Sequence, residues 1–214
     1  MATASIDADG ATIVGEVTLP EQAVGVVAFA HGSGSSRHSP RNKSVAASLQ
    51  EAGLATLLVD LLTSDEEEVD LRTRELRFDI ALLARRLLAA TEWLGRQPET
   101  TGLPLGYFGA STGAAAALIA AARHGDRVRA VVSRGGRPDL AGDALPDVRA
   151  PTLLVVGGRD EVVLELNRQA LAQLEGEKQL VVVPDATHLF EEPGALERVA
   201  ALACAWFGRH LAGR

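Results

Sequence analysis

The fold of this chain is decided by the stretch Leu105-Gly106-Tyr107-Phe108-Gly109-Ala110-Ser111-Thr112-Gly113-Ala114-Ala115-Ala116-Ala117. An apolar run of strand length leads into a Gly-x-Ser-x-Gly turn, and the alanines that follow are strong helix formers. Glycine-flanked serines are also frequent in ordinary turns, so the pattern gains its meaning from this strand and helix. A serine on such a sharp turn has its hydroxyl exposed above a sheet, near the N-terminus of the following helix. The stretch therefore predicts Ser111 as a candidate nucleophile.

Outward from this unit, strand-like runs alternate with helical runs, which is typical of a mostly parallel sheet with helices on both faces. The expected strands are Val24–Ala30, Leu54–Val59, Leu103–Phe108, Val128–Ser133, Thr152–Val156 and Gln179–Val183, with Ala11–Leu19 as an edge strand. The expected helices are Ser39–Ala52, Leu71–Gln97, Thr112–His124, Glu161–Leu174 and Gly194–Leu211. We expect residues 1–214 to form a single α/β domain, in which the acidic segment Thr63–Asp70 is a polar loop.

Charge and cysteine content exclude several classes of protein. The chain has 214 residues and a formal net charge of −7, and it has no basic stripe, so we expect no nucleic-acid partner. No basic segment followed by an apolar core opens the sequence, and no apolar run is long enough to span a bilayer. We therefore expect a cytoplasmic protein without membrane association. Cys204 is the only cysteine, which excludes an internal disulfide and a multi-cysteine metal site.

A serine nucleophile needs a base and an acid that orients the base. Ligands of open α/β sheets bind beyond the carboxyl ends of the strands, and Asp160 and His188 each follow an expected strand there. Their order after Ser111 is the order serine, acid, histidine used by α/β-hydrolases. Asp160 would also suit a helix cap, with Glu161 and Asp185 as substitute acids, and His188 would suit an ordinary polar loop.

Acyl transfer also needs donors for the carbonyl oxygen, which gains negative charge in the reaction. The backbone N–H of Thr112 directly follows the nucleophile, and the glycine-rich loop after Ala30 offers the N–H of Ser33, with Gly34 close behind. We expect Ser33 and Thr112 to form an oxyanion hole. The alternative is a phosphate-binding loop, but the glycine spacing matches neither a Walker loop nor a dinucleotide fingerprint.

Four motifs together resemble the dienelactone hydrolase family of α/β-hydrolases: His31-Gly32-Ser33-Gly34, Gly109-Ala110-Ser111-Thr112-Gly113, Gly158-Arg159-Asp160 and Ala186-Thr187-His188-Leu189-Phe190-Glu191-Glu192-Pro193-Gly194. The resemblance runs from about Gly25 to Phe207. It implies an α/β-hydrolase fold, with Ser111 as nucleophile, His188 as base, Asp160 as orienting acid, and oxyanion donors at Ser33 and Thr112. Dienelactone hydrolases proper have cysteine as the nucleophile, so the serine puts their lactone substrate in doubt. The chain looks more like the small serine-type members, including those fused to phosphoribosyltransferase domains.

These features predict a serine hydrolase of small carboxylic esters that works through an acyl-enzyme, with no cofactor and no metal. The resemblance places lids after the strand Val128–Ser133, and Gly135–Ala150 has room only for a loop, so we expect no lid domain. We expect a small-molecule ester as partner and a monomer or homodimer. The alternatives are a noncatalytic binding protein with the hydrolase fold, or an acyltransferase that uses the same triad. Arg37, His38 and Arg41 follow the oxyanion loop. They are candidates to contact an anionic substrate, and the alternative is that they are charges of a solvated loop.

Overall fold

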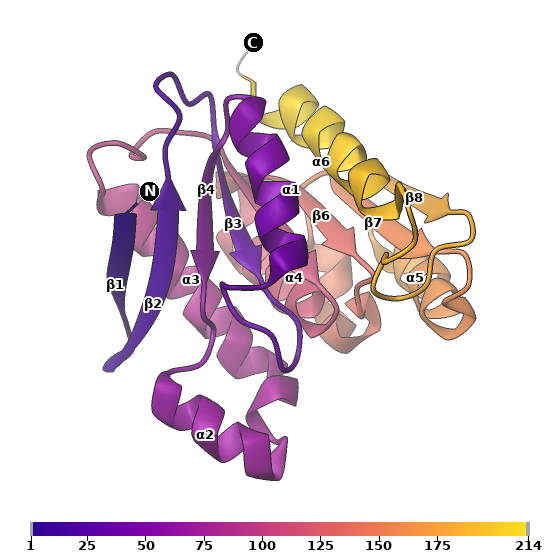
Figure 1. Cartoon of the computed structure of the whole chain (residues 1–214), viewed down its shortest axis with the longest axis horizontal. Coiled ribbons are helices and arrows are strands. Elements are labelled where there is room, and N and C mark those ends of the chain that lie inside the picture. Colours follow the sequence, from indigo (N-terminus) through magenta and orange to yellow (C-terminus); the bar gives the residue numbers. More distant parts are fainter. Residues whose placement is uncertain (1, 213–214) are drawn as a thin grey trace.

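The structure of the protein is a computed structural model, which describes residues 2–212. An eight-stranded sheet has the order β1-β2-β4-β3-β5-β6-β7-β8 (Figure 1). The strands are β1 (Ala2–Ala8), β2 (Ala11–Thr18), β3 (Val26–Ala30), β4 (Ala55–Val59), β5 (Leu105–Ala110), β6 (Val128–Arg134), β7 (Thr152–Gly157) and β8 (Lys178–Val183). The α-helices are α1 (Pro40–Glu51), α2 (Ser64–Thr73), α3 (Ile80–Arg96), α4 (Thr112–His124), α5 (Glu161–Gln173) and α6 (Ala195–Leu211). The 3₁₀ segments are η1 (Leu76–Phe78), η2 (Gly125–Arg127) and η3 (Pro138–Asp147).

The sheet is parallel from β4 to β8, and β1 and β2 form its antiparallel edge. Helices α1 and α6 cover one face, whereas α3, α4 and α5 cover the other (Figure 1). Strands β3, β4, β5 and β7 are buried at every residue, as expected for apolar strands that are covered on both faces. The alternation of strands and helices therefore predicted the architecture correctly.

The expected strand arrangement was incomplete at the N-terminus, because β1 rather than Ala11–Leu19 forms the edge of the sheet. Strand β1 pairs antiparallel with β2, with Ile6 opposite Ile13. Asp9 and Gly10 join the two strands and both have positive φ, which is the backbone of a tight hairpin turn. Alanines supply most of the buried positions of β1, so its hydrophobic alternation is weak in the sequence.

The expected polar loop at Thr63–Asp70 was wrong, because α2 occupies this segment. Thr63 and Glu66 form a capping box, in which each side chain accepts a hydrogen bond from the backbone N–H of the other residue. Carboxylates in the first turn also interact favourably with the helix dipole, so the acidic run stabilises a helix start. The expected helix Leu71–Gln97 is accordingly split: α2 ends before Arg74, which has φ 61, and Asp79 caps α3.

The segment between β6 and β7 is also more ordered than the loop expected at Gly135–Ala150. It holds the 3₁₀ turns of η3, which are kinked at Gly142 (φ 51). Within the described residues this segment carries no separate lid domain, as expected. Helix α2 follows β4 and lies beyond the carboxyl end of that strand (Figure 1).

Candidate active site

Ser111 lies on a strained turn between β5 and α4. Its φ of 50° and ψ of −122° belong to a region that residues with a side chain seldom adopt. The Ser111 N–H donates to the carbonyl of Arg134 at 3.3 Å, and the Ser111 carbonyl accepts from the N–H of Arg137 at 3.0 Å. The segment after β6 therefore holds the turn on both sides of its serine.

Small residues are required around this turn because other backbone segments approach it closely. A Cβ on Gly113 would lie 2.2 Å from the carbonyl oxygen of Ala30, and one on Gly109 would lie 2.4 Å from Cα of Ala114. Gly32 in the loop after β3 is equally constrained, because its Cβ would lie 2.9 Å from Cβ of Ser111. The glycines thus bring the loop after β3 into contact with Ser111.

Asp160 and His188 meet although 28 residues separate them in the chain: Nδ1 of His188 lies 2.6 Å from Oδ2 of Asp160. The loops after β7 and β8 approach closely at Gly157, where a Cβ would lie 2.4 Å from the carbonyl oxygen of Ala186. Asp160 occupies the position before α5, but its side chain makes no capping hydrogen bond to that helix. Its carboxylate is directed to the imidazole instead, so the capping interpretation does not explain this residue.

The two substitute acids lie elsewhere. Asp185 forms an exposed ion pair with Arg159 at 3.3 Å. Glu161 is exposed in the first turn of α5. Within the described residues, neither forms a hydrogen bond with His188.

The structure places Ser111 and His188 near a common segment without joining them directly. No hydrogen bond links the Ser111 hydroxyl to His188 among the hydrogen bonds of residues 2–212. Gly135 follows the residue that binds the Ser111 N–H, and a Cβ on it would lie 3.5 Å from Nδ1 of His188. Catalytic hydrogen bonds are often long in ligand-free structures and shorten when substrate binds, so this arrangement is compatible with proton transfer.

Ser33 and Thr112 lie side by side, with their hydroxyl oxygens 3.0 Å apart. In the part of the chain that the structure describes, neither backbone N–H donates to a protein acceptor. Thr112 is the first residue of α4, so its N–H has no acceptor within the helix. The two N–H groups are therefore available to a ligand oxygen.

His31 holds this loop in place, a role that sequence reasoning missed. The residue is 8% exposed, its Nε2 accepts from the N–H of Leu61 at 3.0 Å, and its Nδ1 lies 3.0 Å from the carbonyl oxygen of Gly32. Since Nε2 is an acceptor, Nδ1 carries the hydrogen and donates to Gly32. Burial lowers the pKa of His31, so the ring is a neutral link between the loops after β3 and β4.

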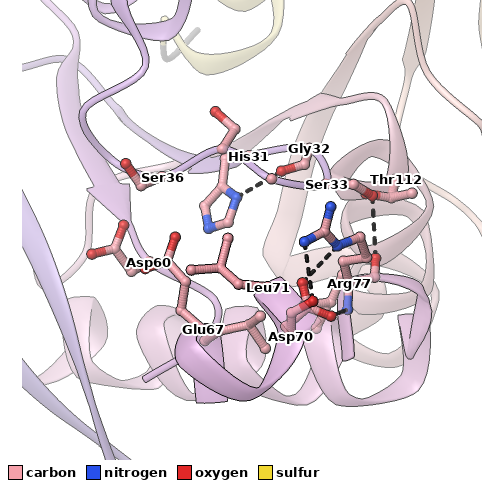
Figure 2. A pocket seen from close by; sticks show the side chains of 14 residues that line it. His31, Gly32, Ser33, Ser36, Asp60, Glu67, Asp70, Leu71, Arg77 and Thr112 are labelled. Atoms are coloured by element: carbon pink, nitrogen blue, oxygen red, sulfur yellow. Dashed lines mark hydrogen bonds and ion pairs between the residues drawn. The ribbon is translucent and has the colours of Figure 1, made fainter. Parts of the chain in front are cut away.

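A small cavity of about 50 Å³ opens beside Ser33 and Thr112 (Figure 2). A bound water needs roughly 10–15 Å³ of such space, so the cavity has room for a few heavy atoms. Leu62, Leu71 and Leu83 form apolar parts of its wall. Neither Ser111 nor His188 belongs to its lining, so the cavity begins at the pair of N–H groups and extends toward α2 and α3.

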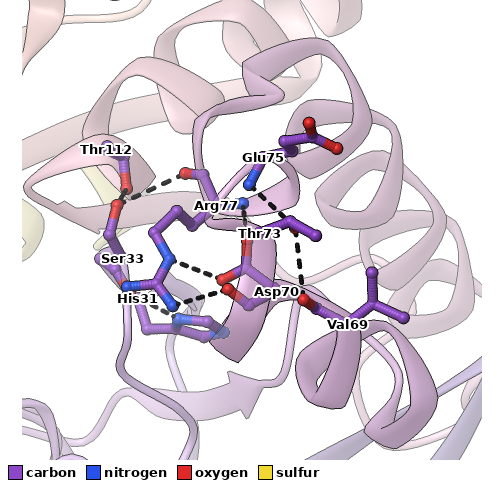
Figure 3. A network of polar contacts seen from close by, with 9 residues as sticks. His31, Ser33, Val69, Asp70, Thr73, Glu75, Arg77 and Thr112 are labelled. Atoms are coloured by element: carbon purple, nitrogen blue, oxygen red, sulfur yellow. Dashed lines mark hydrogen bonds and ion pairs between the residues drawn. The ribbon is translucent and has the colours of Figure 1, made fainter.

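The wall of this cavity contains a buried ion pair between Asp70 and Arg77 (Figure 3). Asp70 is 3% exposed and accepts from Nε of Arg77 at 2.6 Å and from the Arg77 N–H at 2.9 Å. Burial opposes ionisation of Asp70, but the hydrogen bonds and the charge of Arg77 outweigh it and lower the pKa of this carboxyl. The Arg77 carbonyl in turn accepts from the Ser33 hydroxyl at 3.4 Å, which connects α2 to the oxyanion residues.

No cluster of three or more His, Cys, Asp or Glu side chains within residues 2–212 has the arrangement of a metal site. Over the same range, none of the helices combines the length and the apolar character needed to cross a membrane. Cys204 is half-buried on α6, and burial raises the pKa of its thiol.

Comparison with known proteins assigns this arrangement to a family. Residues 11–210 match the model of the dienelactone hydrolase family. The chain belongs to the dienelactone hydrolase family. A crystal structure of a dienelactone hydrolase from Anabaena variabilis is 60% identical, with a TM-score of 0.96 over 98% of this chain and 97% of that chain. The same fold is found in Est1E from Butyrivibrio proteoclasticus, at 18% identity and a TM-score of 0.83 over both whole chains.

Two curated relatives come from Mycobacterium tuberculosis, strains CDC 1551 and H37Rv, and each is named "Putative phosphoribosyl transferase". Each is 65% identical over 201 residues, which are 94% of this chain and 44% of the relative. The chain thus spans less than half the length of these relatives. As a member of the dienelactone hydrolase family it has the α/β-hydrolase fold that its motifs predicted.

The three basic residues that follow the oxyanion loop, Arg37, His38 and Arg41, have different partners in the structure. Arg37 forms an ion pair with Asp60 and lies 3.7 Å from Glu16, and His38 is exposed at the same distance from Glu16. The exposed His38 therefore fits the solvated-loop interpretation, whereas Arg37 is mostly buried and is held by Asp60. Arg41 differs because its one ion pair within residues 2–212 is a 3.4 Å contact with Glu191.

Proposed function

We propose that this chain hydrolyses small carboxylic esters through an acyl-enzyme on Ser111. The observation that carries the proposal is the 2.6 Å contact between His188 and Asp160 at the same sheet edge as the strained Ser111. In this mechanism His188 takes the hydroxyl proton as Ser111 attacks the carbonyl carbon, and then gives that proton to the leaving alcohol. Water, deprotonated by the same histidine, releases the acid.

Asp160 orients His188 by accepting the hydrogen on Nδ1, which leaves Nε2 free to accept the serine proton. The N–H groups of Ser33 and Thr112 donate to the carbonyl oxygen as it becomes negatively charged. A single donor of this kind lowers the barrier by about 3–4 kcal/mol in enzymes where one has been removed. The cavity beside these donors favours a short acyl group, because only a few heavy atoms fit within about 50 Å³.

Hydrolysis of p-nitrophenyl acetate by the wild type and by Ser111→Ala tests the mechanism. We expect the variant to lose activity by about a thousandfold or more, because no other group supplies the nucleophile. Ser48→Ala removes an exposed hydroxyl on α1 and should leave the rate unchanged. Equal rates for Ser111→Ala and the wild type would exclude the acyl-enzyme, and added alcohols that yield new esters would indicate acyl transfer.

A further inference from the structure

Arg134, at the end of β6, is a buried cation that forms no ion pair within the described residues. Its residue is 8% exposed, and its Nε and Nη1 atoms are fully enclosed with no hydrogen-bond partner within residues 2–212. Its guanidinium lies over the Phe190 ring, with Cζ 5.9 Å from the ring centroid. An aromatic face satisfies only part of a desolvated cation, so the site favours the arrival of an anion.

Arg41, the second residue of α1, adds another positive charge nearby, because it contacts Glu191, the residue that follows the Phe190 ring on which Arg134 packs. Its Nε is enclosed without a partner, and its Nη1 reaches only the largely exposed carboxylate of Glu191, at 3.4 Å. Burial and the charge of Arg41 together lower the pKa of Arg134 to about 10, which still leaves this guanidinium charged near neutral pH. Of the two cations, only Arg41 has a carboxylate partner within residues 2–212, and that partner is largely exposed.

This pair adjoins the proposed catalytic residues. The Arg134 carbonyl binds the Ser111 N–H, and the position of a Cβ on the next residue, Gly135, is 3.5 Å from Nδ1 of His188. Arg134 shares the sheet face of Val132, which belongs to the core layer of α1 and α6. The cavity beside Ser33 lies toward α2 and α3, so the two regions are on opposite sides of Ser111.

The charges on the two sides differ in sign. Three carboxylates, Asp60, Glu67 and Asp70, line the cavity. Asp60 and Asp70 are each paired with an arginine, Arg37 and Arg77, so that side has no surplus positive charge to attract an anionic group. On the other side Arg41 contacts Glu191, and Arg134 forms no ion pair within residues 2–212. A doubly charged oxyanion would match the charge of the two guanidinium groups, which form charge-assisted hydrogen bonds with phosphate and carboxylate oxygens.

We propose that Arg134 and Arg41 bind an oxyanion carried by the substrate, best a phosphate monoester, on the side of Ser111 opposite the acyl cavity. The bound anion replaces the weak contact of Glu191 with Arg41. The inference rests on the proposed ester hydrolysis for its link to substrate, but anion binding itself can be measured without turnover.

Calorimetric titration with inorganic phosphate at constant ionic strength tests the site directly. We expect binding to the wild type, and binding at least about tenfold weaker in Arg41→Gln and Arg134→Met, since charged hydrogen bonds are lost. Glu191→Gln should bind phosphate more tightly, because it removes the competing carboxylate. The matched control is Arg168→Gln, which loses the same charge on α5 and should bind like the wild type.

A kinetic experiment tests the link to substrate. Phosphate should inhibit hydrolysis of p-nitrophenyl acetate competitively, and Arg41→Gln should weaken this inhibition by the same factor as the binding. Absent phosphate binding, or equal losses in Arg41→Gln and Arg168→Gln, would overturn the anion site. If phosphate binds but does not compete with p-nitrophenyl acetate, the role of the anion site in substrate binding would be overturned. If Arg134→Met does not fold, phosphate binding by Arg41→Gln and Glu191→Gln still tests the anion site. A wild-type enzyme that binds phosphate but has no esterase activity would contradict the proposed function and not the anion site.

Discussion

Ser111 illustrates how one residue is held in an unfavourable conformation. A non-glycine residue in its region of φ and ψ costs about 1–3 kcal/mol, which the surrounding structure must offset. The hydrogen bonds with Arg134 and Arg137 provide part of this compensation, and the close packing at Gly113 prevents relaxation of the turn. The strain keeps the serine side chain clear of the strand that leads to it.

The pH dependence of stability is expected to reflect His31. Its pKa in the folded protein lies below the unfolded value of 6.5, so below that pH the unfolded chain binds more protons than the folded one. The stabilising effect of the neutral ring is complete above pH 6.5 and is lost as the pH falls toward the lowered pKa. The slope contributed by one such group is at most about 1.4 kcal/mol per pH unit.

Urea denaturation between pH 5 and 8 measures this effect. His31→Gln should be less stable than the wild type at pH 8, because the link between Gly32 and Leu61 is altered, but it should lose less stability on acidification. His38→Gln removes an exposed imidazole and should keep the wild-type pH profile. A profile for His31→Gln that is parallel to the wild type would contradict this assignment.

At the scale of elements, α2 shapes the cavity beside the oxyanion residues. Its capping box starts the helix, and Asp70 near its end binds Arg77, whose carbonyl binds the Ser33 hydroxyl (Figure 3). A change at the start of α2 is therefore transmitted to the cavity wall. The isolated helix is short and polar, so its stability depends on the cap and on this contact.

Thr63→Ala tests the contribution of the cap. The loss of an N-cap hydroxyl should destabilise the protein or its α2 segment by about 1 kcal/mol. We expect hydrogen exchange in α2 to accelerate and KM for p-nitrophenyl acetate to rise more than kcat falls, because the cavity wall loosens. Thr73→Ala, at the far end of the same helix, is the control, and an equal effect of both variants would contradict a specific role of the cap.

At the scale of the whole molecule, parallel strands bring distant residues to one edge. Ser111, Asp160 and His188 follow β5, β7 and β8, and β6 separates the first of these strands from the other two. The segment after β6 bridges that gap, since Arg134 binds the Ser111 N–H and Gly135 packs against His188. The proposed site is thus a property of the sheet order.

Asp160→Asn and Asp185→Asn distinguish the two candidate acids. We expect Asp160→Asn to lower kcat by about 10³–10⁴-fold, because an amide does not stabilise the required tautomer and charge of His188. Asp185→Asn breaks only an exposed ion pair and should change kcat little. The circular dichroism spectra of the two variants should be alike. A large loss of kcat in Asp185→Asn with little loss in Asp160→Asn would assign the orienting acid to Asp185.

The sequence alone determined the alternation of strands and helices and the turn at Ser111, because these follow from local periodicity and from glycines whose positions are visible in the chain. It also identified Asp160 and His188 as candidates, since each follows an apolar run that forms a strand. It did not reveal α2, because an acidic run resembles a loop until its capping box is recognised. Nor did it indicate the functional interest of Asp70, Arg77 or Arg134. Their significance depends on burial and on the presence or absence of a partner far away in the chain, and only the tertiary structure brings such groups together.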